Sequence, residues 1–261
     1  LIVVTTDNSN VLMLNNMINV GTINPLGVVS NVANPFTMKI LGGAAYNDKV
    51  VLKIIYYSDG VQLKDESVLF YINPDYDHID INEVGLTVSS NSRLGWSNYY
   101  PEEKDPFNIN GKGLTYKSLE NLIYCGGLMV GSSAARVSDN VYGLMQGSVL
   151  EYDFDFTPSS WLETDTSLPD YYASSGMFDD DMAFSNKLNI DVTQKLMAWD
   201  KPGEEHYVML RYTIKNKGIS PISDLYAGLF ADFEVIQSWQ NQTNYDAQYT
   251  LGYTFKPGYG P

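Results

Sequence analysis

The sequence has few residues that form disulfides or bind zinc, and it has no long apolar segment of the kind that crosses a membrane. Cys125 is its only cysteine, so no intrachain disulfide can form, and its apolar neighbours predict a buried small side chain. With two histidines and one cysteine, a zinc site is not expected. No apolar run approaches the roughly 18–20 residues of a spanning helix, so we expect no membrane insertion.

Basic residues are also scarce. The chain has 16 Lys and Arg against 31 Asp and Glu, a net charge of −15, which disfavours binding to phosphate backbones and anionic lipids. The chain begins at Leu1 without a basic-then-apolar signal sequence, so we expect a processed or excised part of a longer polypeptide. The acidity favours a soluble surface, either simply solvated or binding cations.

Aromatic and branched residues are abundant instead, with 20 Tyr, 10 Phe and 4 Trp. These residues favour pleated sheets, and no segment keeps a 3.6-residue apolar period for three turns. The sequence therefore predicts an all-β protein. The expected strands are 1–6, 36–41, 49–57, 67–72, 83–89, 122–130, 149–156, 188–199, 205–215, 224–235 and 247–255.

A seam at Asn73-Pro74-Asp75 divides the chain into a region 1–74 and a larger region 75–261. We expect a β-sandwich in each, the second interrupted by long loops at 97–112 and 157–187. Binding residues are expected on such loops, if anywhere.

The sequence resembles large secreted bacterial proteins of the Bacteroidetes type that are associated with gingipain-like and subtilisin-like peptidases. Region 1–74 is similar to their immunoglobulin-like modules, but without the first two strands. Region 75–261 is similar to the non-catalytic, β-rich, jelly-roll-like part that follows. The residues that carry the resemblance are "NPFTMKILGGAAYNDKVVLKIIYYSDG", "SVLFYIN", "RLGW", "YCGGLMVGSSAARVSDNVYG", "DFDF", "DLYAGLFADFEV" and "NYDAQYTLGYTF".

Ser133 lies in Gly131-Ser132-Ser133-Ala134-Ala135, which is similar to the serine turn of subtilisin-type peptidases. Such a nucleophile needs a base and an acid to orient it. Neither His78 nor His206 has the neighbours of the catalytic histidine in subtilisin-type peptidases. The serine turn also departs from the family pattern, because Arg136 follows Ala135 and the proline expected shortly afterwards is absent. We therefore expect no enzyme: the glycines allow a close turn between strands, and the serines satisfy backbone groups there.

Three acidic clusters are possible calcium sites, because calcium takes six to eight oxygen ligands. The strongest candidate joins Asp232 and Glu234, two apart on one strand, with Asn244 and Asp246 after an insertion. The other clusters are Asp75, Asp77 and Asp80 at the seam and Asp179-Asp180-Asp181 in the second loop. The alternative is that these acids cap turns or face solvent.

Aromatic side chains near the long loops are possible ligand-facing residues: Trp96, Tyr99, Tyr100, Tyr171 and Tyr172. Exposed rings of this kind stack on sugars, which suggests a glycan-binding face. Alternatively, they fold back over the edge of the sandwich.

An immunoglobulin-like module without its first strands would have an unpaired sheet edge and an incompletely covered core. Exposed edges recruit strands, from flanking parts of the same polypeptide or from another copy of the chain. The larger region covering the gap is a third possibility. We therefore expect a secreted or cell-surface structural module, a homo-oligomer growing head to tail, with an adhesin-like, glycan- or calcium-dependent binding domain as the alternative.

Overall fold

The computed structural model describes residues 1–45, 47–95, 111–117, 119, 122–141, 145–146, 149–150, 154–235 and 238–258. The chain forms two compact units, Leu1–Pro74 and Asp75–Pro261, which are considered separately below. Their boundary falls at the proline of the seam seen in the sequence.

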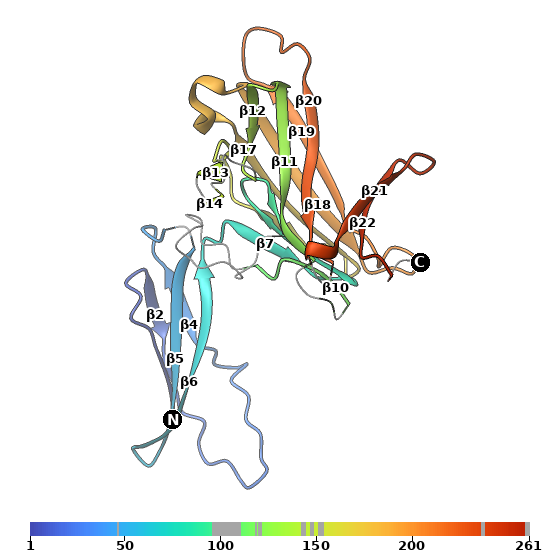
Figure 1. Cartoon of the computed structure of the whole chain (residues 1–261). Coiled ribbons are helices and arrows are strands. Elements are labelled where there is room, and N and C mark those ends of the chain that lie inside the picture. The colour runs from blue at the N-terminus through green and yellow to red at the C-terminus, as the bar shows by residue number, and fades with distance from the viewer. Residues whose placement is uncertain are drawn as a thin grey trace. The chain divides into compact units, whose positions relative to one another are not determined.

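Unit 1 consists of a four-stranded antiparallel sheet in the order β3-β1-β5-β6 and a two-stranded sheet of β2 and β4. The hairpin of β5 and β6 is its longest element (Figure 1). The strands are β1 (Ile2–Thr5), β2 (Val11–Asn15), β3 (Met17–Ile18), β4 (Thr37–Ile40), β5 (Asp48–Ser58) and β6 (Val61–Ile72).

The core of unit 1 is small. Val11 of β2 packs with Val50 of β5 and Ile72 of β6, so the two sheets meet through these three buried side chains. Val4 and Ile18 are the other buried hydrophobic side chains of this unit, among the residues described. Both belong to the four-stranded sheet.

Unit 2 is a larger set of antiparallel sheets. The first sheet contains β7 (Tyr76–Ile79), β8 (Val84–Ser89), β9 (Arg93–Leu94), β10 (Leu114–Tyr116), β11 (Ile123–Ser133), β12 (Arg136–Asp139) and β20 (Tyr226–Phe233). The second contains β15 (Thr157–Pro158), β16 (Glu163–Asp165), β17 (Tyr171–Asp179), β18 (Ile190–Trp199) and β19 (Met209–Asn216). Two small hairpins pair β13 (Met145–Gln146) with β14 (Val149–Leu150), and β21 (Gln242–Asp246) with β22 (Leu251–Phe255).

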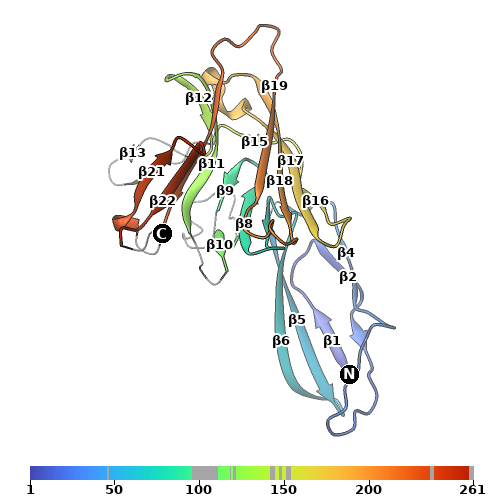
Figure 2. The same cartoon turned by 90° about the vertical axis from the view of Figure 1, so that its right-hand side faces the viewer.

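These two larger sheets lie face to face (Figure 2). They pack against each other through two apolar clusters. In the first, Leu128 and Val130 of β11 contact Phe178 of β17 and Ile190 of β18. In the second, Ile79 and the apolar side of β8 contact Leu196 and Ala198 of β18. Because each cluster contains residues of both sheets, unit 2 is a β-sandwich with its own core.

A polar layer separates the two clusters. On the inward face of β18, Gln194 lies between Val192 of the first cluster and Leu196 of the second. Its side-chain amide donates to the backbone oxygen of Ser89, and Asn140 donates to the backbone oxygens of Asn91 and Phe156. The buried members are Ser89, Asn91, Arg93, Asn140, Ser174 and Gln194.

The all-β prediction is confirmed, since the only helices among the described residues are the short 3-10 segments η1 (Asp181–Asn186) and η2 (Ser238–Gln240). The prediction of a loop over 157–187 is wrong, because β17 pairs along its whole length with β18. The inward-facing positions of β17 include Ser174 and Gly176. Because these two residues are not hydrophobic, the sequence lacks the alternation of apolar and polar residues that predicts a strand. Most of the predicted loop 97–112 lies outside the described residues.

Candidate interaction surfaces

The apolar inner face of unit 1 is only partly covered. In antiparallel pairs, residues directly opposite each other share a face. Met38 and Ile40 of β4 are opposite Met13 and the buried Val11, so they belong to the inner face. They are nevertheless 39% and 47% exposed. The two-stranded sheet therefore leaves an apolar margin uncovered.

The opposing sheet has a matching exposed margin. Val68 of β6 is opposite Leu52, which packs against the unit 1 core, and yet Val68 is 47% exposed. In the described part of the chain, β6 and β4 are each paired on one side alone. Each edge strand thus presents unpaired backbone groups beside uncovered apolar side chains.

The segment between β3 and β4 adds exposed apolar side chains to unit 1. It has no regular secondary structure, and Leu26, Val28 and Val32 are almost fully exposed. A free apolar segment and an incomplete sandwich therefore occur in the same unit.

The seam acids are dispersed among different partners. Asp77 accepts a hydrogen bond from the Tyr172 hydroxyl on both carboxylate oxygens, at 3.0 Å each. Asp80 forms an ion pair with Lys112 at 3.1 Å, and Asp75 is buried. Burial and the adjacent Asp77 raise the pKa of Tyr172 well above its usual value, which keeps the hydroxyl protonated as the donor.

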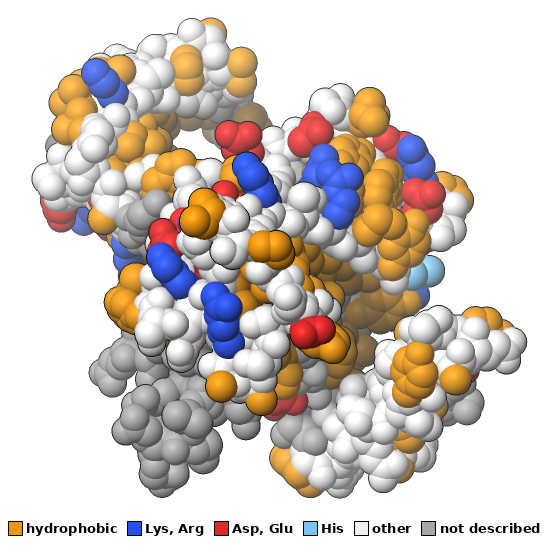
Figure 3. Space-filling model, turned by 90° about the horizontal axis from the view of Figure 1, so that it is seen from above, with side chains coloured by type: hydrophobic (Ala, Val, Ile, Leu, Met, Phe, Trp, Pro, Cys, Tyr) orange, Lys and Arg blue, Asp and Glu red, His pale blue; other side chains and the backbone are white. Residues whose placement is uncertain are grey.

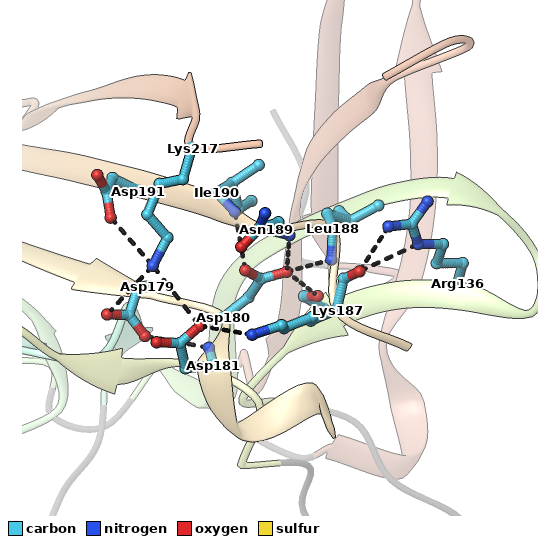
Figure 4. A network of polar contacts seen from close by, with 11 residues as sticks. Arg136, Asp179, Asp180, Asp181, Lys187, Leu188, Asn189, Ile190, Asp191 and Lys217 are labelled. Carbon is cyan, nitrogen blue, oxygen red and sulfur yellow. Dashed lines mark hydrogen bonds and ion pairs between the residues drawn. The ribbon is translucent and has the colours of Figure 1, made fainter. Parts of the chain in front are cut away.

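Two residues of the triple-aspartate cluster, Asp179 and Asp181, lie around a lysine together with Asp191 (Figure 4). The Lys217 ammonium lies 3.6 Å from Asp179, 3.6 Å from Asp181 and 3.4 Å from Asp191. Burial lowers the pKa of Lys217, but the three carboxylates outweigh it and raise the pKa overall. A hydrogen bond from Lys187 and the charge of Lys217 lower the pKa of Asp181. A lysine thus occupies the position where a cation was predicted.

Asp180 points the other way, into the protein, and is fully buried. Its carboxylate accepts hydrogen bonds from the backbone N–H groups of Leu188, Asn189 (3.1 Å) and Ile190 (2.9 Å), and from the Ser138 hydroxyl (3.1 Å). It therefore ties the start of β18 to β12, as a structural anchor.

The predicted cage of Asp232, Glu234, Asn244 and Asp246 is spread over two elements. Asp232 is exposed on β20, opposite Cys125, and Glu234 follows that strand. The Asp246 carboxylate instead accepts hydrogen bonds from the backbone N–H groups of Gln248 and Tyr249. These hydrogen bonds close the turn of the β21–β22 hairpin. Within the described ranges, no group of three or more His, Cys, Asp or Glu side chains is arranged to hold a metal ion.

Ser133 ends β11, at the Ala134–Ala135 turn before β12. It borders a shallow apolar hollow of about 500 Å³, together with Met129, Val137 and Tyr226. Each histidine forms a hydrogen bond elsewhere: His78 with the Thr87 hydroxyl and His206 with the Tyr116 hydroxyl.

The glycines before Ser133 do not form the expected turn. Gly126 and Gly127 lie within β11, where a Cβ on Gly127 would come within 2.9 Å of the Ser92 backbone oxygen. These glycines allow another segment to approach the strand closely. The turn itself is made by the two alanines.

Two of the five predicted ligand-facing aromatics are in the described residues. Tyr172 is partly buried and packs against the second apolar cluster, with its hydroxyl donating to Asp77. Tyr171 faces outward and contacts Trp199, with ring centroids 5.5 Å apart. Trp96, Tyr99 and Tyr100 lie outside the described residues.

Charged side chains of both signs are interspersed with hydrophobic ones on the face shown in Figure 3. No helix among the described residues is long and apolar enough to cross a membrane. No protein-family model matches the chain, and no curated protein or solved structure matches it either. The resemblance to peptidase-associated modules therefore stays a prediction.

Proposed function

We propose that the protein is a non-catalytic, extracellular structural module that accepts a β-strand on unit 1. The observation that carries this proposal is the uncovered inner face of unit 1, where Met38, Ile40 and Val68 are exposed beside two edge strands. An added strand would satisfy the edge hydrogen bonds and bury these side chains.

The strand comes from a second copy of the chain or from a flanking part of a longer polypeptide. The exposed segment between β3 and β4 supports the first source, because it carries exposed apolar side chains and has no regular secondary structure. Insertion of this segment into the next copy is a heterologous contact, which repeats head to tail and builds a filament on the cell surface. The second source would make unit 1 an accessory module of a secreted peptidase-like protein.

The test is the solution mass of the full chain by light scattering, from micromolar to several hundred micromolar. We expect mass to grow with concentration above the 29.2 kDa of one chain. The double variant Met38→Asp/Ile40→Asp should suppress this growth, because it places charge on the face to be buried. Leu12→Asp is the matched control, since Leu12 is equally exposed but lies on the opposite face of the same sheet.

A monomer at every concentration would exclude assembly from copies of this chain alone. The flanking-segment form would then be tested by adding synthetic peptides with the apolar alternation of a strand. Failure of every such peptide to protect the amides of β4 or β6 from hydrogen exchange would overturn the proposal.

A further inference from the structure

Three aromatic side chains form a row on the outer face of unit 2, at the end of β18. The Trp199 ring lies 5.5 Å from the Tyr171 ring and 6.5 Å from the Tyr207 ring, with interplanar angles of 43° and 49°. Their neighbours Tyr172 and Ala198 point inward, into the second apolar cluster, so the row faces outward. Tyr207 is 41% exposed, and the other two rings are half-buried.

Polar and charged groups border the aromatic row. The Lys195 ammonium lies 5.9 Å from the centre of the Tyr171 ring, and Lys201 forms an ion pair with Asp170 at 3.2 Å. A hollow of about 490 Å³ is lined by Asp200, the residue that follows Trp199 in the chain. Its lining also includes Glu83, Lys201 and Glu205. The surface thus combines ring faces with a rim composed mainly of carboxylates.

One asparagine holds this surface in place. The Asn82 side-chain amide donates to the backbone oxygens of Trp199 (3.2 Å), Glu204 (3.4 Å) and Tyr207 (3.0 Å). The Glu83 N–H also donates to the Glu205 oxygen at 3.0 Å. Because both ends of the 200–207 loop are fixed, little conformational entropy is lost when a ligand binds.

The carboxylates of the rim are ready to accept hydrogen bonds. Backbone N–H groups of the 203–205 turn hold the pKa of Glu205 below its usual value, so it is charged at neutral pH. Glu205 lines the hollow together with Asp200, so both carboxylates lie where a ligand in the hollow would donate hydrogen bonds.

The chemistry of the rim selects among ligands that stack on aromatic rings. A proline-rich peptide also packs against such rings, but proline has no N–H to donate to carboxylates. An anionic ligand would be repelled by Glu83, Asp200 and Glu205. A neutral sugar offers an apolar ring face to the aromatics and hydroxyl donors to the carboxylates, which matches both parts of the site.

We infer that the row of Tyr171, Trp199 and Tyr207, with the hollow beside it, binds a neutral polysaccharide. Successive sugar rings would lie along the three aromatic rings, and hydroxyl groups would donate to Asp200 and Glu205. This site lies in unit 2 and does not depend on strand addition to unit 1.

The experiment measures binding of the full chain to cellulose, xylan, laminarin and soluble starch, with dextran sulfate and polyproline as chemically distinct probes. We expect binding to at least one neutral polysaccharide, weakened about tenfold or more in Tyr207→Ala and Trp199→Ala. Tyr226→Ala is the matched control, because Tyr226 is exposed on the other sheet, and it should bind as the unaltered protein does.

Circular dichroism shows whether each variant is folded, and Tyr207→Ala keeps the test valid if Trp199→Ala is not. The inference is overturned if the folded protein binds none of the four neutral polysaccharides. It is also overturned if polyproline alone binds, or if Tyr207→Ala binds with unchanged affinity. The solution mass is recorded on the same samples, so loss of sugar binding and loss of assembly are distinguished.

Discussion

The two units of this protein bury their apolar side chains to very different degrees. Among the described residues of unit 1, five hydrophobic side chains are buried: Val4, Val11, Ile18, Val50 and Ile72. Unit 2 has two extended clusters that join both sheets of its sandwich. Hydrophobic burial is the dominant favourable term in folding. Unit 2 therefore has the larger apolar core of its own, whereas the inner face of unit 1 is left partly uncovered.

The largest effect expected in unit 2 comes from Asp180→Ala. The substitution leaves three backbone N–H groups and the Ser138 hydroxyl without their buried acceptor. We expect a loss of about 3–5 kcal/mol in the free energy of unfolding of unit 2. Chemical denaturation measures it. In the control Asp181→Ala, an exposed residue, the loss should be far smaller; equal losses would contradict the anchor role.

Two valines of unit 1 test how much of its inner face is covered. Val50→Ala removes fully buried methyl groups and should destabilise unit 1 by about 2 kcal/mol. Val68→Ala, on the same face but exposed, should change the stability of the monomer by about 0.5 kcal/mol or less. Thermal unfolding of dilute protein measures both. Similar losses would mean that the face is already covered in the monomer.

Lys217→Ala tests how unit 2 balances its acidic cluster. Asp179, Asp181 and Asp191 would then repel one another, and we expect a loss of about 1–2 kcal/mol in low salt. Millimolar calcium should restore much of the melting temperature of the variant, because calcium takes carboxylate ligands. The same calcium should leave the unaltered cluster unaffected, since the lysine fills it. A variant indifferent to calcium would show that the three carboxylates do not converge in solution.

The pH dependence of this cluster follows from the two shifted groups. The raised pKa of Lys217 gives stability that is present at neutral pH and lost as the pH rises through that value. The lowered pKa of Asp181 gives stability that is lost as the pH falls through it. In Lys217→Ala, the part of the alkaline loss that Lys217 causes should disappear, whereas the part that comes from the raised pKa of Tyr172 should remain.

Ser133→Ala is expected to have the smallest effect. Ser133 lies at an exposed turn, so its replacement should change the free energy of unfolding by less than about 0.5 kcal/mol. Any hydrolysis of an acyl ester substrate by the purified protein should be unchanged in the variant. Loss of such an activity would contradict the assignment of Ser133 to the turn.

The sequence predicted what depends on local composition and failed where distant residues meet. Branched and aromatic residues were enough to predict the all-β class, and the Asn73-Pro74 pair marks the place where the units divide. The strand β17 was missed because Ser174 and Gly176 face the polar layer, so its inward positions are not apolar. The role of Asp180 was missed as well, since its partners are Ser138 and the start of β18.

The aromatic row was only partly predictable. Tyr171 was singled out inside the predicted loop 157–187, but Trp199 and Tyr207 lie inside the expected strands 188–199 and 205–215 and were not singled out. Their alignment depends on the register of β17 with β18, where Tyr171 is opposite Trp199. It also depends on Asn82, more than a hundred residues away in the chain.

The polar layer within unit 2 has a calorimetric consequence. Exposure of apolar groups raises the heat capacity on unfolding and exposure of polar groups lowers it, with a typical net increase of about 12–15 cal/mol/K per residue. Gln194, Asn140 and Arg93 are fully or almost fully buried between the clusters, so their exposure offsets part of the apolar contribution. The heat-capacity increment of unit 2 should therefore be slightly smaller than that of a sandwich of equal size with an entirely apolar core. A smaller increment slightly flattens the dependence of stability on temperature, so the polar layer makes the stability of unit 2 somewhat less sensitive to cooling and warming.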